Sequence, residues 1–370
     1  MQDLQERKKT RYSFSMETPE SASRHEDGRF PRRPCTALAP MATLSHEALR
    51  LLIHSFGDPD FYYSEMIHAP SLLAGARFEE FYLRAAPCPE RMVWQLTSPD
   101  AGAMARAVPL VLAAGGVGVD LNMGCCAPAI VRTGAGISWM LRPLEETAAM
   151  VQGVRRALDA WNRGKPQEEE RRLSVKLRLG ETLSFPRLLD FCSMLAAEGV
   201  QQITLHPRLK KEKYSRPARW ETVARLAESL PVPVYGNGDC FSAEDAVSLL
   251  RRFPCAGLMA GRGAVRRPWL FRGIRAAWSG TVPDGGFPPV DLLETAELFV
   301  RFLTERLPPE FQNSRARRFF FYFCDNFTFA HYVRTQVLNA ATPPDMLEAL
   351  RTYCRQNPQE RFSFPAEKRP

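Results

Sequence analysis

Eight short apolar runs, each followed by a loop and an amphipathic stretch of helical character, dominate the middle of the chain. The runs are residues 35–39, 61–65, 92–96, 117–122, 173–179, 202–206, 232–236 and 256–260. Near-continuous apolar strands that alternate with amphipathic helices are typical of parallel sheets covered by helices. Eight such units within about 250 residues predict an α/β fold, a (β/α)8 TIM barrel. A doubly wound open sheet is the alternative with the same alternation.

The segments on either side of these units have a different character. Residues 1–34 are polar and charged without apolar periodicity, which predicts a disordered N-terminal tail or an overlong gene start. Residues 279–289 form a linker rich in proline and glycine, and only helical patterns follow it. We therefore expect a barrel domain over residues 35–279 and a smaller, all-helical C-terminal domain over residues 290–370.

Composition limits the class of protein. No apolar run reaches the roughly 18 residues of a membrane span, and no signal-peptide pattern opens the chain, so we expect a cytoplasmic protein without membrane contact. The nine cysteines form no regular framework and are expected to be reduced thiols. Neither a CxxC pair nor an HExxH motif indicates a metal site, so no metal is expected. The net charge of +8 permits a polyanionic partner without requiring one.

Glycine-rich turns follow the last two apolar runs. They read GNGD at 236–239 and GRG at 261–263. In a barrel the active site is built from the loops that follow the strands, and backbone N–H groups in such turns bind phosphate. Taken alone, each sequence could also be a turn without any role in binding phosphate. Together, with Arg262 beside them, they favour a phosphorylated cofactor.

Two polar side chains interrupt or end apolar runs. Lys176 lies within a run that otherwise has the character of core. It either forms a salt bridge outside the barrel or points into the mouth, where its charge would stabilise an anionic reduced flavin ring. His206 either caps its strand or binds a phosphate or a flavin.

In their order along the chain, these motifs resemble those of the tRNA-dihydrouridine synthases, FMN-dependent barrels with a C-terminal helical domain that reduce uridine in tRNA. The matching stretches are LAPMA, SEM, QL, LNMGC, VKLRLG, LHPR, YGNGD and MAGRGAVRRPWLF, between residues 36 and 273. The resemblance implies FMN as the cofactor, NADPH as its reductant and tRNA as the partner, with no protein partner predicted. The residues it implies for FMN are Pro40, Met41, Ala42, Gln95, Lys176, His206, Asn237, Gly238, Asp239, Gly261 and Arg262.

The resemblance also gives Cys125 the place of the catalytic cysteine. Reduced flavin would deliver hydride to carbon 6 of uracil, and a thiol on the opposite face would protonate carbon 5. The thiol must then stay protonated, without a close cation that lowers its pKa. Cys126 stands where the family has proline, which removes a fixed φ beside Cys125. Cys126 is either a second candidate acid or a small buried side chain.

A uracil stacked within tRNA must be turned out of its stack to reach a barrel mouth. Basic and polar residues near the mouth and in the helical domain are therefore predicted to bind tRNA. They are Asn122, Lys210, Lys211, Lys213, Arg266, Arg267, Arg315, Arg317 and Arg318. The HPR motif is followed by Leu209 where the family has threonine, a change in a loop expected near RNA. The aromatic run 319–323 is interpreted as helix core rather than as a platform for bases.

Two other functions stay open from the sequence. One is an FMN barrel that acts on a small pyrimidine, such as a dihydroorotate or dihydropyrimidine dehydrogenase; the helical domain and the basic loops argue against it. The other is an RNA-binding or folding-chaperone relative that has lost catalysis, which the Cys126 departure makes conceivable. Retention of Lys176, Cys125 and the phosphate turns argues against this second alternative.

Overall fold

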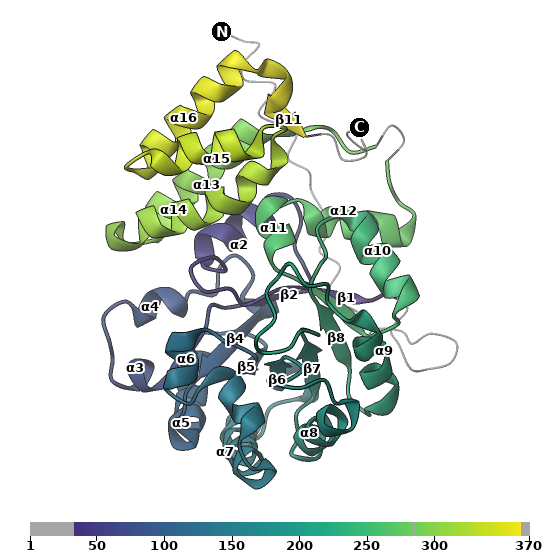
Figure 1. Cartoon of the computed structure of the whole chain (residues 1–370). Helices are drawn as coiled ribbons and strands as arrows, with labels where there is room; N and C mark the ends of the chain where they lie inside the picture. The colour runs from purple at the N-terminus through teal and green to yellow at the C-terminus, as the bar shows by residue number, and fades with distance from the viewer. Residues whose placement is uncertain (1–32, 284–285, 364–370) are drawn as a thin grey trace.

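A computed structural model describes residues 33–283 and 286–363, and eight parallel strands close a barrel within it (Figure 1). The ring closes because β1 pairs with both β2 and β9, while β2 pairs with β4. The TIM barrel is thereby confirmed and the open sheet excluded. The strands are β1 Cys35–Leu38, β2 Phe61–Tyr63, β4 Met92–Thr97, β5 Gly118–Met123, β6 Arg172–Leu177, β7 Gln202–Leu205, β8 Val234–Asn237 and β9 Gly257–Ala260.

One short strand, β3 (Ile67–His68), was not predicted. It pairs with the end of β4 outside the ring. The predicted N-terminal tail lies outside the described residues except for its last two. Of these, Arg33 forms an ion pair with Asp60 at 2.6 Å, beside the start of β1.

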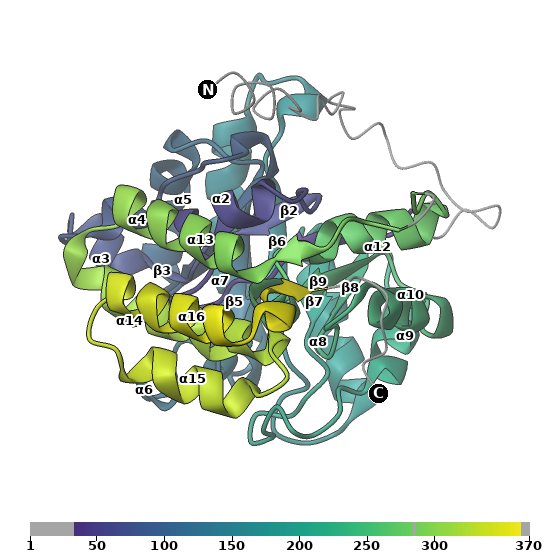
Figure 2. The ribbon, with the colours of Figure 1, turned by 90° about the horizontal axis from the view of Figure 1, so that it is seen from above.

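Helices surround the barrel, and those expected between the apolar runs are confirmed (Figure 2). Sequence signals explain their ends: Ser242 and Asp245 form a reciprocal capping box at the start of α10. No helix in the described ranges is long and apolar enough to cross a membrane. The helices are α2 Glu47–His54, α3 Ala69–Leu73, α4 Glu79–Tyr82, α5 Ala101–Ala113, α6 Pro128–Arg132, α7 Leu144–Asn162, α8 Phe185–Ala197, α9 Trp220–Ser229, α10 Ala243–Arg252, α11 Arg262–Arg266 and α12 Leu270–Ser279.

The barrel interior is divided into an apolar and a polar part. Ala37, Ala39, Tyr63, Val93 and Met259 form a small apolar cluster of their own. On the other side, β4, β5 and β6 turn amide, carboxyl, hydroxyl and ammonium groups inward. Buried polar groups need partners. This part of the interior is therefore where a ligand or a hydrogen-bond network is expected.

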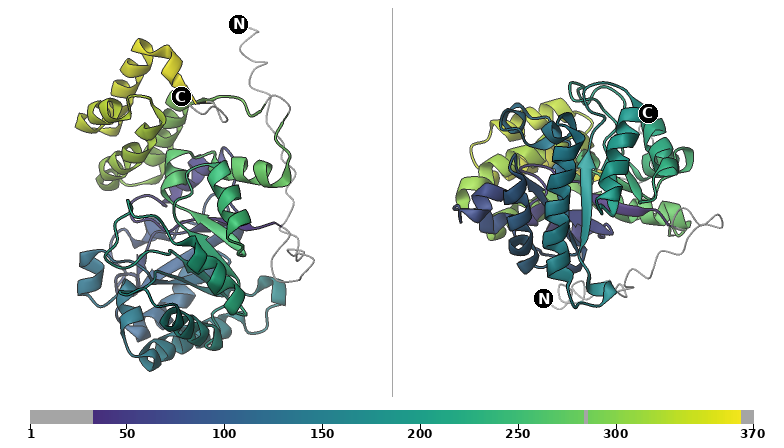
Figure 3. Two further views of the ribbon diagram at one scale, coloured as in Figure 1. Left: turned by 45° about the vertical axis from the view of Figure 1, so that its right-hand side comes forward. Right: turned by 90° about the horizontal axis from the view of Figure 1, so that it is seen from below.

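The C-terminal helical region is confirmed and lies on one side of the barrel (Figure 3). Its helices are α13 Leu292–Arg306, α14 Pro309–Phe323, α15 Ala330–Asn339 and α16 Pro343–Gln356. The short strands β10 (Val290–Asp291) and β11 (Phe362–Ser363) pair and bring its two ends together. The aromatic run is core, as interpreted: Phe319, Phe320 and Phe323 are fully buried, although Phe321 is exposed.

The segment 314–340, expected as one helix, is interrupted between α14 and α15. Asn326 explains the break, because its Nδ2 donates to the carbonyl of Phe323 at 2.9 Å and to that of Arg266 at 2.6 Å. Arg266 in turn donates to the Asp325 carbonyl at 2.6 Å. A turn that binds the barrel thus replaces a continuous helix.

Candidate active site

The loop that follows β5 carries Cys125, and its backbone is held on both sides. The N–H of Cys125 donates to Asn122 Oδ1 at 2.9 Å, and its carbonyl accepts from the N–H of Ile137 at 3.0 Å. These two bonds fix the loop without the proline that Cys126 replaces. Both thiols of the pair are partly buried.

The Cys125 thiol is held in its protonated form. Burial raises its pKa, and this outweighs the opposing effects of a hydrogen bond from the Ala127 backbone and of the charges on Lys176 and Arg178. A protonated thiol can donate a proton, whereas a thiolate acts as a nucleophile or metal ligand. The site therefore favours Cys125 as an acid.

Lys176 lies inside the barrel, opposite Asn122 of the neighbouring strand in the sheet register. Burial lowers its pKa to about 8, Arg178 adds to the lowering, and Asp120 opposes it. Its ammonium forms no hydrogen bond or ion pair with any residue that the structure describes. The interior alternative is thus the correct one, and the cation is free to meet a ligand.

Arg208 is a fully buried arginine that sequence reasoning did not select, although it is part of the LHPR motif. Its Nη2 donates to both oxygens of Asp239, at 2.6 and 2.7 Å, and its Nη1 donates to His206 Nε2 at 2.9 Å. It also donates to the carbonyls of Arg216 and Tyr214 at 2.6 and 3.1 Å. One guanidinium thus joins the GNGD turn to the loop after β7.

His206 is neutral, and its proton can be assigned. Burial lowers its pKa far below the ordinary value, and the charges of Lys176 and Arg178 lower it further. Because a guanidinium can only donate, Nε2 is the acceptor for Arg208 and Nδ1 carries the proton. His206 therefore offers an N–H donor, as the predicted role in binding phosphate or flavin requires.

The two glycine-rich turns pack directly against each other. Asn237 Nδ2 donates to the carbonyl of Met259 at 2.7 Å, which joins β8 to β9. Gly238 has a φ of +124°, a conformation that favours glycine. A Cβ on Gly263 would lie 2.1 Å from the Cys240 carbonyl oxygen, so only glycine permits this approach. The turns form one continuous surface.

Free backbone donors line that surface. Within the described ranges, five N–H groups of the two turns donate to no protein acceptor: those of Gly238, Asp239, Gly261, Arg262 and Gly263. The Arg262 guanidinium lies 3.6 Å from Asp239 and 4.3 Å from the centre of the Tyr214 ring. Unpaired N–H groups with an arginine beside them fit a phosphate group.

The loop after β1 borders this surface. A Cβ on Gly261 would lie 3.2 Å from Met41 Sδ, which places the predicted residues Pro40, Met41 and Ala42 next to the GRG turn. Thr43 has a φ of +64°, unusual for a β-branched residue. Its N–H donates to the buried carboxyl of Glu65, whose pKa burial raises to about 7. Sequence reasoning missed this role of Glu65 within the SEM motif.

Gln95 and Asn122 lie beneath the mouth. Both are buried, and Asn122 donates to Gln95 Oε1 at 2.9 Å. The Gln95 amide also donates to Asp120 at 2.7 Å. Their predicted contacts with cofactor and RNA stay predictions, since both amides already have partners.

The other residues predicted to bind tRNA fall into two groups. The first group is exposed: Lys211 and Lys213 on the loop after β7, and Arg318 on α14. The second group, Lys210 and Arg267, already binds other parts of the protein. Lys210 forms an ion pair with Glu181 at 2.8 Å, and Arg267 donates to the Phe241 carbonyl at 3.4 Å. Lys211, Lys213 and Arg318 are thus the members of the prediction with the fewest protein contacts.

Three arginines are corrected from predicted RNA contacts to structural residues. Arg315 is only 8% exposed, and its guanidinium stacks over Phe311 at 3.9 Å. Arg317 donates to the carbonyls of Leu338 and Ala340 at the end of α15. Arg266 binds the turn between α14 and α15, as described above. The charge pattern predicted contacts with RNA, but these three guanidinium groups bind or pack against other parts of the protein.

One cluster of metal-binding residue types exists in the described part of the chain. His54 Nδ1 lies 2.9 Å from Asp58 and 3.8 Å from Cys88 Sγ. Tyr62 also donates to Asp58, at 2.6 Å, and Arg91 lies 3.9 Å from the same carboxyl. An ion pair between His54 and Asp58 accounts for the arrangement, and the expected absence of a metal stays a prediction.

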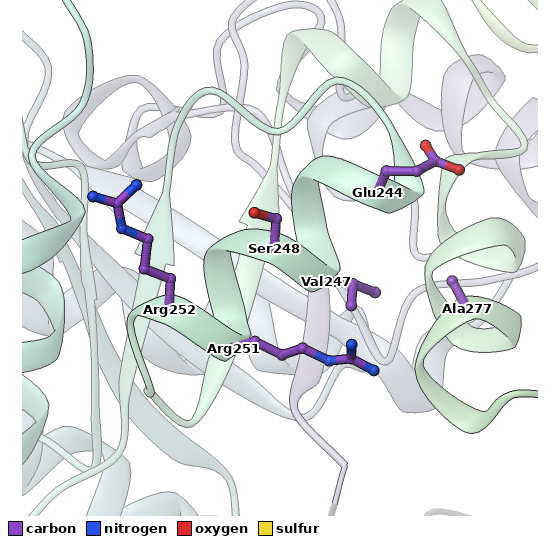
Figure 4. A pocket seen from close by; sticks show the side chains of 6 residues that line it. All are labelled: Glu244, Val247, Ser248, Arg251, Arg252 and Ala277. Atoms are coloured by element: carbon purple, nitrogen blue, oxygen red, sulfur yellow. The ribbon is translucent and has the colours of Figure 1, made fainter. Parts of the chain in front are cut away.

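A surface hollow lies away from the barrel mouth, between α10 and α12 (Figure 4). Glu244, Val247, Ser248, Arg251 and Arg252 of α10 line it, with Ala277 of α12 opposite. None of the predicted site residues borders this hollow. The chemistry therefore concentrates at the carboxyl ends of the strands.

The closed (β/α)8 barrel carries free backbone N–H groups after its last two strands, an unpaired lysine in its interior and a protonated thiol at its mouth. This combination is typical of a barrel enzyme. Comparison with known proteins gives the family. The family model "Dihydrouridine synthase (Dus)" matches residues 37–353. The chain belongs to the dihydrouridine synthase family, which confirms the resemblance found in the sequence.

Individual relatives agree with this assignment. The tRNA-dihydrouridine(16) synthase of Cupriavidus necator is 31% identical over 262 residues, which cover 68% of this chain and 77% of that protein. A probable tRNA-dihydrouridine synthase 1 of Synechocystis is 29% identical, covering 63% of this chain and 62% of that one. The tRNA-dihydrouridine(47) synthase [NAD(P)(+)] of Cryptococcus neoformans is 29% identical, covering 80% and 40%. The chain thus spans between 40 and 77% of the length of these relatives.

Proposed function

We propose that this protein reduces uridine in tRNA to 5,6-dihydrouridine in an FMN-dependent reaction. The observation that carries the proposal is the placement of Cys125, a protonated thiol, at the same barrel mouth as Lys176 and the phosphate-binding turns. A uracil ring reduced by hydride at carbon 6 needs a proton at carbon 5. We assign this proton to Cys125, whose neutral thiol lies in the mouth beside the second candidate, Cys126.

The residues of the mouth fit a flavin mononucleotide. The five free N–H groups and Arg262 would hold its phosphate, and His206 offers a further N–H donor. Lys176 would place a positive charge at the ring, while the loop of Pro40, Met41 and Ala42 forms one wall. When bound in its reduced form, FMN supplies the hydride.

The chain's own residues manage the proton. Cys125 holds it on Sγ, because burial keeps the thiol neutral. Lys176, with its pKa lowered to about 8, stays largely protonated at pH 7 and would stabilise negative charge on a ligand. Neutral His206 adds a donor without adding charge.

The remaining parts of the proposal concern reductant, partner and location. NADPH is proposed to regenerate reduced flavin, in keeping with the NAD(P)(+) in the name of the Cryptococcus relative. tRNA is the proposed partner, bound by the exposed basic residues at the mouth and on α14. A cytoplasmic location, where nine free cysteines stay reduced, belongs to the same proposal.

Purified protein is expected to be yellow and to release non-covalent FMN on denaturation. Arg262→Ala should weaken FMN binding roughly 10-fold or more, because a charge-assisted bond to phosphate is lost. Arg252→Ala, on the outer face of α10, is the matched control and should retain FMN fully. The measurement is flavin fluorescence titration of apoprotein. A colourless protein that takes up no FMN would refute the flavin-dependent function.

Lys211→Ala combined with Lys213→Ala, and separately Arg318→Ala, are expected to weaken tRNA binding. Each phosphate contact removed lowers the salt slope of binding by roughly one unit. Arg156→Ala, on the exposed side of α7, is the control of equal charge for Arg318→Ala. Filter binding at several salt concentrations gives affinity and slope.

Equal activity on free uridine and tRNA would instead favour a small-pyrimidine enzyme.

A further inference from the structure

A line of hydrogen bonds inside the barrel runs from Asp120 to the loop of Cys125. Gln95, beside Asp120 in the sheet register, donates through Nε2 to Asp120 Oδ2 at 2.7 Å. Asn122 donates through Nδ2 to Gln95 Oε1 at 2.9 Å. Asn122 Oδ1 then accepts from the N–H groups of Cys125 at 2.9 Å and Gly124 at 3.2 Å. Asp120 and Gln95 are both 0% exposed.

The direction of this line is set at its ends. A side-chain amide has nearly the same shape when its oxygen and nitrogen exchange places, so only its partners decide which way it points. The Asp120 carboxylate can only accept, and the backbone N–H groups of Gly124 and Cys125 can only donate. Both ends therefore require that Gln95 turns its NH2 group to Asp120 and that Asn122 turns its oxygen to the loop of Cys125. A reversed Gln95 would point its oxygen at the carboxylate.

The carboxylate itself is fixed from a second strand. Ser174 of β6 donates through Oγ to Asp120 Oδ1 at 2.6 Å, which leaves Oδ2 for Gln95. Tyr63 bonds both to Ser174 and to Gln202, and Gln202 bonds to Thr204, so a second set of interior groups supports the anchor of the carboxylate. Asp120 is thus the anchored acceptor from which the orientation of both amides follows.

We propose that Asp120 is a positioning residue for Cys125. Its role is that of a hydrogen-bond acceptor: it holds Gln95 and Asn122 in the one orientation that places an oxygen under the N–H of Cys125. The inference rests on the proposed function only where it assigns Cys125 the proton. A role through charge is the alternative, since Lys176 lies two residue pairs away in the register and Asp120 opposes the lowering of its pKa.

Two variants separate these roles. Asp120→Leu removes the acceptor and keeps the branched outline of the side chain, with larger methyl groups in place of the two oxygens. Asp120→Asn removes the charge but keeps an oxygen for Gln95, and its NH2 group can turn to Ser174 Oγ, which can also accept. Thr204→Val is the matched control, because Thr204 is equally buried in the barrel interior and accepts from Gln202 rather than from a member of this line.

Three quantities are measured on the FMN-loaded full chain: single-turnover dihydrouridine formation on tRNA, tRNA affinity, and the ratio of iodoacetamide alkylation rates at Cys125 and Cys126 by mass spectrometry. Asp120→Leu is expected to slow dihydrouridine formation roughly 10- to 100-fold, as a misplacement near 1 Å does. It should also change the alkylation ratio, with tRNA affinity unchanged. Asp120→Asn and Thr204→Val should stay within about threefold of the unmodified protein in all three.

Equal loss in Asp120→Asn and Asp120→Leu, with an unchanged alkylation ratio, would show that charge is what matters and overturn the proposal. Should Asp120→Leu fail to fold, Gln95→Leu breaks the next link and must shift the same ratio. If the unmodified protein forms no dihydrouridine, the proposed function fails. The alkylation ratio then decides the positioning role by itself.

Discussion

Cys125→Ala is expected to abolish most dihydrouridine formation, by roughly 100- to 10,000-fold, the range by which general acids contribute. The structure gives the reason: the Cys125 thiol is kept protonated by burial, and its loop is fixed by Asn122 and Ile137. Reduction of bound flavin by NADPH should be unaffected, because the proton is needed only after hydride has left. Stopped-flow absorbance of the flavin and mass spectrometry of tRNA nucleosides separate the two half-reactions.

Cys126→Ala is the matched control, since it removes an adjacent thiol of similar exposure. It should retain most activity, because the backbone around it is held by bonds that do not involve its sulfur. Reversed losses in the two variants would make Cys126 the acid. Equal and small losses would show that the proton comes from another group or from water.

Arg208→Met is expected to lower both stability and FMN binding. Removing one partner of a buried ion pair costs about 3–5 kcal/mol. The lower end applies here because the Asp239 side chain is 27% exposed. Without Arg208, Asp239 would keep only the Ala218 N–H and the more distant Arg262, its charge would be less compensated next to the glycine-rich turns, and FMN affinity should fall roughly 100-fold. Urea denaturation of the apoprotein and flavin titration measure the two effects.

Lys210→Met provides the comparison within the same loop. Its ion pair with Glu181 is at the surface, where water screens the two charges, so the pair contributes little to stability. Stability and FMN affinity should both stay close to those of the unmodified protein. An Arg208→Met protein as stable as Lys210→Met would mean that Arg208 does not hold the turn.

The barrel and its two glycine-rich turns were predictable because their signals are local. A few consecutive residues are enough to recognise an apolar run, an amphipathic helix or the glycines at 238 and 263. The role of Arg208 could not be predicted. The LHPR motif contains this arginine, but nothing in it indicates that the guanidinium binds Asp239, 31 residues away. Tertiary contacts of this kind leave no local pattern.

The helical region shows the same limit. Arg315 follows the pattern of a solvated helix face, yet it is covered by Phe311 and bonds to the Tyr82 hydroxyl at 3.4 Å. The break between α14 and α15 depends on Asn326, which reaches a carbonyl 60 residues earlier in the chain. The partners of Arg315 and Asn326 could not be identified from the sequence, because it does not show which parts of the barrel and the helical region are in contact.

Barrel and helical region share one hydrophobic core rather than having one each. A single continuous cluster contains Leu49 of α2, Phe299 of α13 and Phe319 of α14, and the last two rings stack at 3.7 Å. Two parts of a chain that bury the same apolar surface lose it at the same time when either of them opens. The catalytic barrel and its helical extension therefore form one cooperative unit, and a mutation that loosens α13 lowers the melting temperature of the whole molecule.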